Sequence, residues 1–235
     1  MAEDTATETP PEEAAPDATD ERREELLATF AEHLGDAVLD SHLRPGQGLW
    51  IRVATDAWPT VAEVADGPAG CRFFDFLSAI DWLPSPYGRY EDAEVDVPFP
   101  PPMPDPSSAV PGYAGGDTRL QVLASVAKVG TDLRVLLKAD VPDDDARIGT
   151  WTRTFAGAAW HEREAWEMFG ITFEGNPDLR HLYLPTEFEG HPLRKEFPLL
   201  ARVVKPWPGI VDVEPMPGGD DEEDAEAEGE TGEES

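Results

Sequence analysis

Residues 119–139, RLQVLASVAKVGTDLRVLLKA, decide the fold class because they hold two apolar strands joined by a tight turn. The predicted strands are 119–128 and 132–139, and Gly130-Thr131 supplies the turn of the hairpin. In the second strand, Leu136 interrupts an otherwise regular alternation of apolar and charged residues. We therefore expect both faces of the sheet to be partly covered.

Helical and extended segments precede this hairpin. The spacing of Leu27, Phe30 and Leu34 predicts a helix over 21–34, with Asp20 as its cap and Gly35 at its end. Further along, the pattern predicts a strand at 49–54, a short helix at 57–65 and an apolar strand at 72–82.

Two helices are predicted after the hairpin. Asp143, Asp144 and Asp145 favour a helix start, since acids complement the helix dipole, and an apolar stripe of Ile148, Trp151 and Phe155 follows. A second helix is predicted at 159–169, ending at Gly170.

This order predicts an α+β fold, a two-layer domain with helices packed on a mixed β-sheet. The domain is expected to span 21–170 and to include a proline-rich insertion at 83–117. An extended, irregular C-terminal arm, expected to bind a partner, follows at 171–209. Acidic tails at 1–20 and 210–235 are expected to be disordered, because they have few apolar residues to bury.

The charge excludes several classes of protein. The formal net charge is -31, so the chain repels the phosphates of nucleic acids. The sequence shows neither a signal peptide nor the run of about 18 apolar residues that a membrane span needs. We therefore expect a soluble, cytosolic chain.

Cofactor chemistry finds little support in the sequence. The one cysteine, Cys71, cannot supply an iron–sulfur cluster alone and is expected to be a small buried residue. His161-Glu162 begins like a zinc-protease HExxH motif, but Ala165 occupies the place of the second histidine. His181 and His191 lie in a proline-broken segment, where a shared site is conceivable but ordinary hydrogen-bonded histidines are the simpler interpretation. No glycine-rich phosphate loop is present in the sequence.

Glu162 occupies an unusual place on the predicted helix 159–169. A helical wheel puts it on the apolar arc with Trp166 and Phe169, whereas Glu164 and Glu167 lie largely opposite. A carboxylate there needs a partner if it is buried, and an Arg or Lys from the following segment is one candidate. Alternatively, Glu162 points to water in the first helical turn.

The segment after Gly170 is irregular yet apolar. Prolines at 177, 185, 192, 198, 206 and 208 exclude long helices and central strands. Apolar and aromatic residues nevertheless persist through it, which is unusual for a loop of some forty residues. We expect the segment to lie on this domain's own surface or on a partner.

Several of these motifs resemble those of a known family. The stretch HEREAWEMFGI at 161–171, Asp178-Leu179-Arg180 and EGHPLRKEFPL at 189–199 are similar to the C-type subunit family of respiratory complex I, the 30 kDa-type subunit. Asn176 departs from the family pattern, which has His in a Gly-His-Pro-Asp-Leu run, and the insertion 83–117 is longer than expected.

The resemblance implies a structural and assembly subunit in the peripheral arm of a proton-pumping NADH:quinone oxidoreductase, on the cytoplasmic side of the cell membrane. It implies that this chain holds no cofactor and no catalytic residue, while partner subunits bind FMN, iron–sulfur clusters and quinone. The implied partners are chiefly the D-type subunit, and also the B-type and I-type subunits of complex I. The first alternative hypothesis is an equivalent subunit of a membrane-bound hydrogenase or of a quinone oxidoreductase with another electron donor. The second, less favoured by the sequence, is a stand-alone metal-dependent hydrolase.

The matched motifs supply the candidate interface residues. These are Glu162, Arg163, Glu164, Asp178, Leu179, Arg180, His191, Pro192, Leu193, Arg194 and Lys195. Arg194 is expected to make the main contact, because a guanidinium suits bidentate pairing with a partner carboxylate. The competing hypothesis pairs Arg194 with Glu162 inside the chain.

Overall fold

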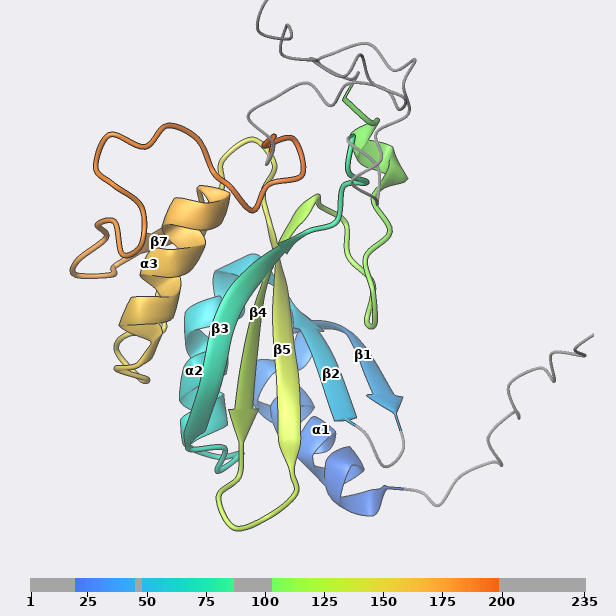
Figure 1. Cartoon of the computed structure of the whole chain (residues 1–235). Helices are drawn as coiled ribbons and strands as arrows, with labels where there is room; N and C mark the ends of the chain where they lie inside the picture. Colours follow the sequence, from blue (N-terminus) through green and yellow to red (C-terminus); the bar gives the residue numbers. More distant parts are fainter. Residues whose placement is uncertain (1–19, 45–47, 87–102, 199–235) are drawn as a thin grey trace, which may run out of the picture.

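The computed structural model describes residues 20–44, 48–86 and 103–198 (Figure 1). The predicted acidic tails, apart from residue 20, lie outside the described residues. So do the middle of the proline-rich insertion, residues 87–102, and the end of the predicted arm, residues 199–209.

A five-stranded mixed sheet forms the centre of the fold (Figure 1). Its strand order is β1-β2-β5-β4-β3; β2 and β5 run parallel, and the other neighbours are antiparallel. The strands are β1 (Val38–Arg44), β2 (Gly48–Val53), β3 (Phe73–Asp81), β4 (Leu120–Ala127) and β5 (Arg134–Val141). The predicted hairpin is therefore the β4–β5 pair, with ends shifted by one or two residues.

Helices cover one face of this sheet, so the predicted α+β, two-layer architecture is confirmed. α1 (Glu21–Leu34) and α2 (Trp58–Asp66) lie behind the sheet in Figure 1, and α3 (Ala158–Phe169) lies along β3. Alternate apolar residues of the strands meet the helices in one core. Its fully buried members include Phe30, Ile51, Trp58, Val122, Val135 and Leu137. The burial removes apolar side chains from water, which is the main driving force for folding.

Short elements link these layers. The 3-10 helices η1 (Gly35–Ala37), η2 (Thr55–Ala57) and η3 (Pro106–Ser108) lie in connections. β6 (Arg147–Gly149) and β7 (Thr172–Glu174) form a separate, parallel two-stranded sheet. In the sequence, β6 precedes α3 and β7 follows it. Residues 172–174, predicted as part of the irregular arm, are therefore paired with the domain.

The second face of the sheet is partly covered, as predicted, by the returning part of the insertion. Trp82 donates its indole N–H to the Gln121 side chain at 2.7 Å, and Gly112 lies against the same indole. Tyr113 stacks on His42 with ring centroids 4.4 Å apart. Lys138 is fully buried beside Trp82, and burial lowers the pKa of its ammonium to about 8.

The helix predicted from Asp143 onwards is wrong. The chain there forms turns and β6, and Asp143 accepts the backbone N–H of Arg119 at 3.1 Å instead of capping a helix. Trp151 belongs to the core: its ring stacks on Trp58 at 4.6 Å, and its indole N–H donates to the Trp58 carbonyl at 2.8 Å. Tertiary packing thus outweighs the helical spacing of the apolar residues.

Two local features also differ from the sequence expectations. The pattern does not predict the edge strand β1, because most of its residues are exposed and its apolar residues do not alternate regularly. Asp20 precedes α1, but its side chain pairs with Arg23 instead of capping a backbone N–H. Gly35 ends α1 as predicted, with a positive φ of 54°.

Candidate functional site

Helix α3 and the segment that follows β7 form the candidate site. The helix ends at Gly170, which adopts the left-handed conformation with φ 72°. We call residues 175–198 the docked segment, because they turn back and lie over α3 without regular secondary structure (Figure 1). A fixed irregular segment must find partners for its backbone polar groups, and side chains of α3 supply several of them.

Glu162 is fully buried and hydrogen-bonded, but not to a cation. Its carboxylate accepts the backbone N–H of Trp151 and the hydroxyl of Thr150, both at 2.6 Å, and the side-chain N–H of Asn176 at 2.8 Å. Burial raises the pKa of Glu162, and these three donors only partly offset the effect. The prediction that Glu162 pairs with an Arg or Lys is therefore wrong, and so is the alternative that Glu162 points to water.

Asn176, which departs from the family pattern, makes two side-chain hydrogen bonds in the site. Its amide N–H binds Glu162, while its side-chain oxygen accepts the backbone N–H of Asp178 at 2.9 Å. One side chain thus connects the buried acid of α3 to the start of the docked segment.

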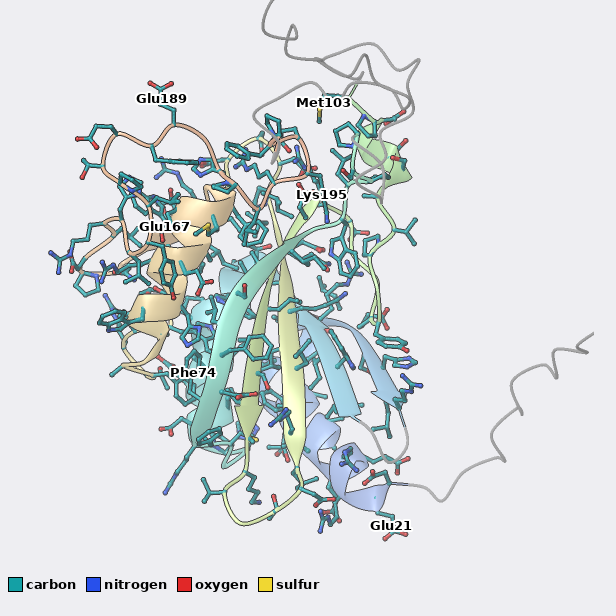
Figure 2. All side chains as sticks on the ribbon, viewed as in Figure 1. Glu21, Phe74, Met103, Glu167, Glu189 and Lys195 are labelled. Atoms are coloured by element: carbon teal, nitrogen blue, oxygen red, sulfur yellow. The ribbon has the colours of Figure 1, made fainter. Side chains whose placement is uncertain are left out.

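Glu167 is the second buried carboxylate, at 2% exposure, although the helical wheel places it on the polar face. It accepts backbone N–H groups of Leu182 at 2.9 Å, Tyr183 at 2.9 Å and Leu184 at 3.3 Å. Burial opposes ionisation, but these donors and His181 outweigh it, so the pKa of Glu167 is lowered. Figure 2 shows Glu167 on α3, with the docked segment around it.

Basic side chains bind the carbonyl groups of the same region. Arg163 donates to the carbonyls of Arg180 at 3.0 Å and His181 at 2.8 Å. At the end of α3, His191 Nδ1 lies 2.8 Å from the Glu167 carbonyl, and Arg194 Nε donates to the Phe169 carbonyl at 2.6 Å. The last carbonyls of a helix lack partners within it, so these contacts satisfy them.

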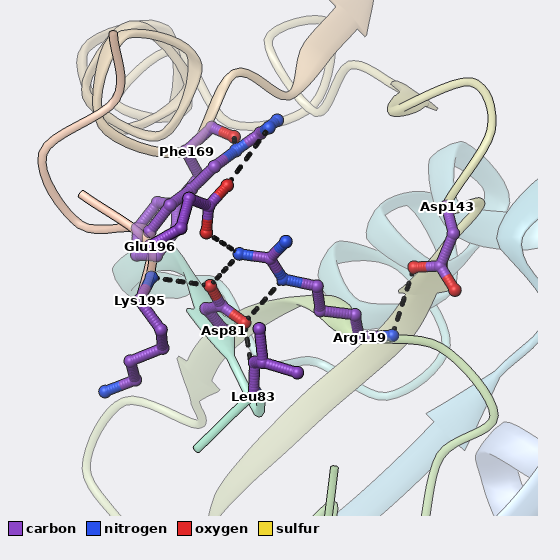
Figure 3. A network of polar contacts seen from close by, with 8 residues as sticks. Asp81, Leu83, Arg119, Asp143, Phe169, Lys195 and Glu196 are labelled. Atoms are coloured by element: carbon purple, nitrogen blue, oxygen red, sulfur yellow. Dashed lines mark hydrogen bonds and ion pairs between the residues drawn. The ribbon is translucent and has the colours of Figure 1, made fainter. Parts of the chain in front are cut away.

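A polar network fixes the far end of the docked segment (Figure 3). The Asp81 carboxylate accepts two bonds from Arg119, at 2.9 and 2.6 Å, and the backbone N–H of Lys195 at 2.8 Å. Arg119 also pairs with Glu196. Burial raises the pKa of Asp81, but Arg119 and the backbone donors of Lys195 and Leu83 outweigh it, so the pKa is lowered.

The candidate interface residues therefore divide into two groups. The side chains of Glu162, Arg163, His191 and Arg194 make the internal contacts above, and Glu162 and Arg194 bind different partners, which excludes the Arg194–Glu162 pair. Leu179 packs against the core, and Pro192 is half-buried. The rest reach the surface: Glu164 is half-buried, Leu193 is 48% exposed, Lys195 is exposed, and Asp178 pairs with Arg180 at 3.0 Å on the exposed surface.

Sequence reasoning does not find Glu167, Asp81 or Arg119. The signal for Glu167 is indirect: an irregular segment with consecutive backbone donors needs an acceptor, and an acid on the preceding helix can supply it. Asp81 and Arg119 carry no signal, since their contact joins residues 38 positions apart.

The described ranges contain no group of three or more His, Cys, Asp or Glu side chains placed to hold a metal ion. Cys71 is buried as predicted, and desolvation raises the pKa of its thiol to about 11. Among residues 20–44, 48–86 and 103–198, no helix is long and apolar enough to cross a membrane.

Comparisons with known proteins identify a family for this chain. A family model described as "Respiratory-chain NADH dehydrogenase, 30 Kd subunit" matches residues 51–203. The C/D subunit of NADH-quinone oxidoreductase from Cronobacter sakazakii is 48% identical over 73 residues, 31% of this chain and 12% of that protein. Its counterpart in Yersinia pestis (strain Pestoides F) is 38% identical over 91 residues, 39% of this chain and 15% of that protein. The chain therefore spans a small fraction of these relatives.

A solved structure shares the fold. It is described as the membrane-bound sulfane sulfur reductase, an archaeal respiratory membrane complex. The TM-score is 0.53 at 19% identity, over 77% of this chain and 88% of that one.

The fold and the site together define an α+β domain whose C-terminal segment docks back on its last helix through buried carboxylates. This chain belongs to the family of the 30 kDa subunit of respiratory-chain NADH dehydrogenase.

Proposed function

We propose that this chain is a structural subunit of the peripheral arm of a proton-pumping NADH:quinone oxidoreductase. In this proposal it holds no redox centre, and it supports electron transfer by positioning the subunits that bind FMN, iron–sulfur clusters and quinone. The observation that carries the proposal is the family match over 51–203, which includes α3 and the entire docked segment.

The docked segment supports a role in assembly. Its backbone is fixed by Glu167, Arg163 and Arg194, so it loses little conformational freedom when a partner binds. Its outer side still exposes apolar side chains: Tyr183 is 63% exposed, and Leu193 is 48% exposed. Exposed aromatic and aliphatic residues on a rigid backbone are typical of protein interfaces.

The proposed partners are chiefly the D-type subunit of complex I, and also its B-type and I-type subunits. The curated relatives support the D-type subunit in particular, because their names join C and D in one protein. The proposed location is the cytoplasmic side of the cell membrane, with attachment through the assembly.

Co-purification tests this function. An affinity tag on the chain should recover, from gently solubilised membranes, NADH:quinone reductase activity together with polypeptides of the B, D and I type. Recovery of hydrogenase-type subunits without NADH-binding polypeptides would show that the chain serves another donor. Recovery of the chain alone, under conditions that preserve the oxidoreductase, would contradict the proposal.

A further inference from the structure

Lys138 is a buried cation on the second face of the sheet. Its neighbours on β5, Leu137 and Ala139, point into the core, so Lys138 points to the face opposite the helices. The side chain is fully buried there, and within the described ranges its ammonium nitrogen Nζ has no hydrogen-bond partner. An ammonium group loses its hydration when it is buried, so a site without acceptors disfavours the charged form.

A short stretch of chain lies over this cation. We call residues 112–117 the strap, because they return from the proline-rich insertion and run across the second face of the sheet. Trp82 extends the cover: Nζ of Lys138 lies 5.6 Å from the centre of its ring, and a Cβ on Gly112 would stand 3.0 Å from the same indole. Because the helices cover only the other face, we attribute the burial of Lys138 to Trp82 and the strap.

Contacts near the surface hold the strap on the sheet. Asp117 accepts a hydrogen bond from Arg52 of β2 at 2.8 Å, but the side chain of Asp117 is 78% exposed, so water weakens this pair. Tyr113 stacks on His42 of β1 with ring centroids 4.4 Å apart, and its hydroxyl accepts an N–H of Arg44 at 3.2 Å. Contacts of this kind allow the strap to open without unfolding of the sheet.

Packing between the strap and the sheet is incomplete. A pocket of about 470 Å³ lies between Trp50, Trp82, Gly112 and Tyr113. The dispersion contacts that hold a tightly packed segment closed are missing across this space. The pocket therefore lowers the cost of lifting the strap.

Neighbouring charges do not replace the missing hydrogen bonds of Lys138. Burial lowers the pKa of Lys138 to about 8; the carboxylates of Asp140 and Asp40 oppose this change, whereas Arg52 adds to it. Asp140 is itself bound by Arg52 at 2.9 Å and by Gln121 at 2.6 Å. The closed strap therefore favours the neutral amine of Lys138.

We propose that the strap is a cover controlled by the protonation of Lys138. When Lys138 is protonated, opening of the strap lets water reach the ammonium group, so the open state becomes more populated. When Lys138 is neutral, the closed state is favoured. This inference does not rest on the proposed function, because it concerns contacts within the chain alone.

The direction of the pH dependence follows from the two states. With the strap closed, burial holds the pKa of Lys138 at about 8, whereas with the strap open the pKa returns towards its ordinary value of 10.5. Between these values the open state binds more protons than the closed state, so the closed state gains stability as pH rises from 8 to 10.5. Below pH 8 both states are protonated, and opening stays at its highest level.

Hydrogen exchange of the strap amides in wild type and in Lys138→Met tests the proposal. Methionine keeps the length and the apolar body of the side chain but removes the charge. At pH 7 the strap amides should exchange at least ~10-fold more slowly in Lys138→Met. Intrinsic exchange rates cancel in the comparison, so the ratio of wild-type to variant rates should fall about tenfold between pH 7 and 9. Lys128→Met removes an exposed lysine next to β4 and, as the matched control, should leave the strap unchanged.

Equal exchange of the strap in wild type and Lys138→Met at pH 7 would overturn the proposal. A ratio that does not change with pH would overturn it as well, because altered packing, and not the proton, would then explain the difference.

A titration of the wild-type protein decides the matter if Lys138→Met fails to fold. The ¹³Cε resonance of Lys138 should titrate with a midpoint near 8, and the strap amide resonances should follow the same midpoint. A midpoint near 10.5, or strap resonances that do not follow Lys138, would refute the inference.

Discussion

Replacing Glu167 with Gln should release the docked segment while leaving the sheet folded. The substitution keeps the size of the side chain but removes its charge and one acceptor oxygen. The amide N–H₂ would then face backbone N–H groups of residues 182–184, which now bind the carboxylate. Because α3 contacts β3 through other residues, we expect the loss to be local.

The magnitude follows from the three backbone bonds. A hydrogen bond to a charged group contributes about 1.5–3 kcal/mol. Residues 182–184 are only half-buried or exposed, so water replaces part of the loss. The expected net cost is about 3 kcal/mol of local stability, which corresponds to roughly a hundredfold in the opening equilibrium.

Hydrogen exchange measures this opening directly. The amides of Leu182, Tyr183 and Leu184 should exchange ~100-fold faster in Glu167→Gln, while those of β4 and β5 should keep their protection. Glu164→Gln, a charge removal three positions earlier on the same helix, should change neither set. Unchanged protection at 182–184 would refute the role given to Glu167.

Three further predictions follow from the same region. Gly170→Ala should lower the free energy of urea unfolding by about 2 kcal/mol or more, because φ is 72° and a Cβ would lie 2.5 Å from His191 Nε2; an unchanged free energy would contradict this. Arg194→Ala should lower the free energy of urea unfolding by about 1–2 kcal/mol, because the hydrogen bond to the Phe169 carbonyl is lost, whereas Lys195→Ala should leave it unchanged. If Glu162→Gln restored the stability lost in Arg194→Ala, the result would support the internal Arg194–Glu162 pair and contradict this account. Burial raises the pKa of Glu162 above 4.5, so protonation of this carboxylate favours the folded state, and its stabilising contribution is lost as pH rises through the folded pKa. The unfolding free energy of wild type minus that of Glu162→Gln should therefore fall as pH rises from 4.5 towards neutrality. A difference that does not depend on pH would contradict this account.

Local patterning predicts most of the fold. The β4–β5 hairpin, β3, α1 and α3 follow regular apolar spacing, and the predicted ends of each lie within two residues of the observed ones. The prediction from Asp143 fails because Ile148, Trp151 and Phe155 satisfy a helical spacing while packing as separate core residues. Gly149 lies so close to Pro59 that a Cβ would stand 2.3 Å from it, a contact between distant residues that no local pattern encodes.

The position of the site is predictable from the sequence, but its hydrogen bonds are not. The motif at 161–171 and its downstream partners locate the region, and the helical wheel identifies Glu162 as a carboxylate on an apolar arc. Its hydrogen-bond donors are Thr150 and Trp151, which precede α3 in the sequence, and Asn176, which follows it. The sequence alone does not show that these neutral donors, and not an Arg or Lys, bind the carboxylate. The sequence wrongly predicts Glu167 to be exposed, because a helical wheel considers only one helix. In the structure, the docked segment covers the polar face of α3 on which Glu167 lies.

Site-specific photo-crosslinking in the intact membrane assembly tests the central claim most directly. The claim is that the outer side of the docked segment contacts a partner subunit. A photoreactive residue at position 183 should form a covalent product with another polypeptide of the NADH:quinone oxidoreductase, preferentially one of the D type. The same residue at position 129, on the exposed β4–β5 turn, should form none. Crosslinks from position 129 together with none from position 183 would contradict the account.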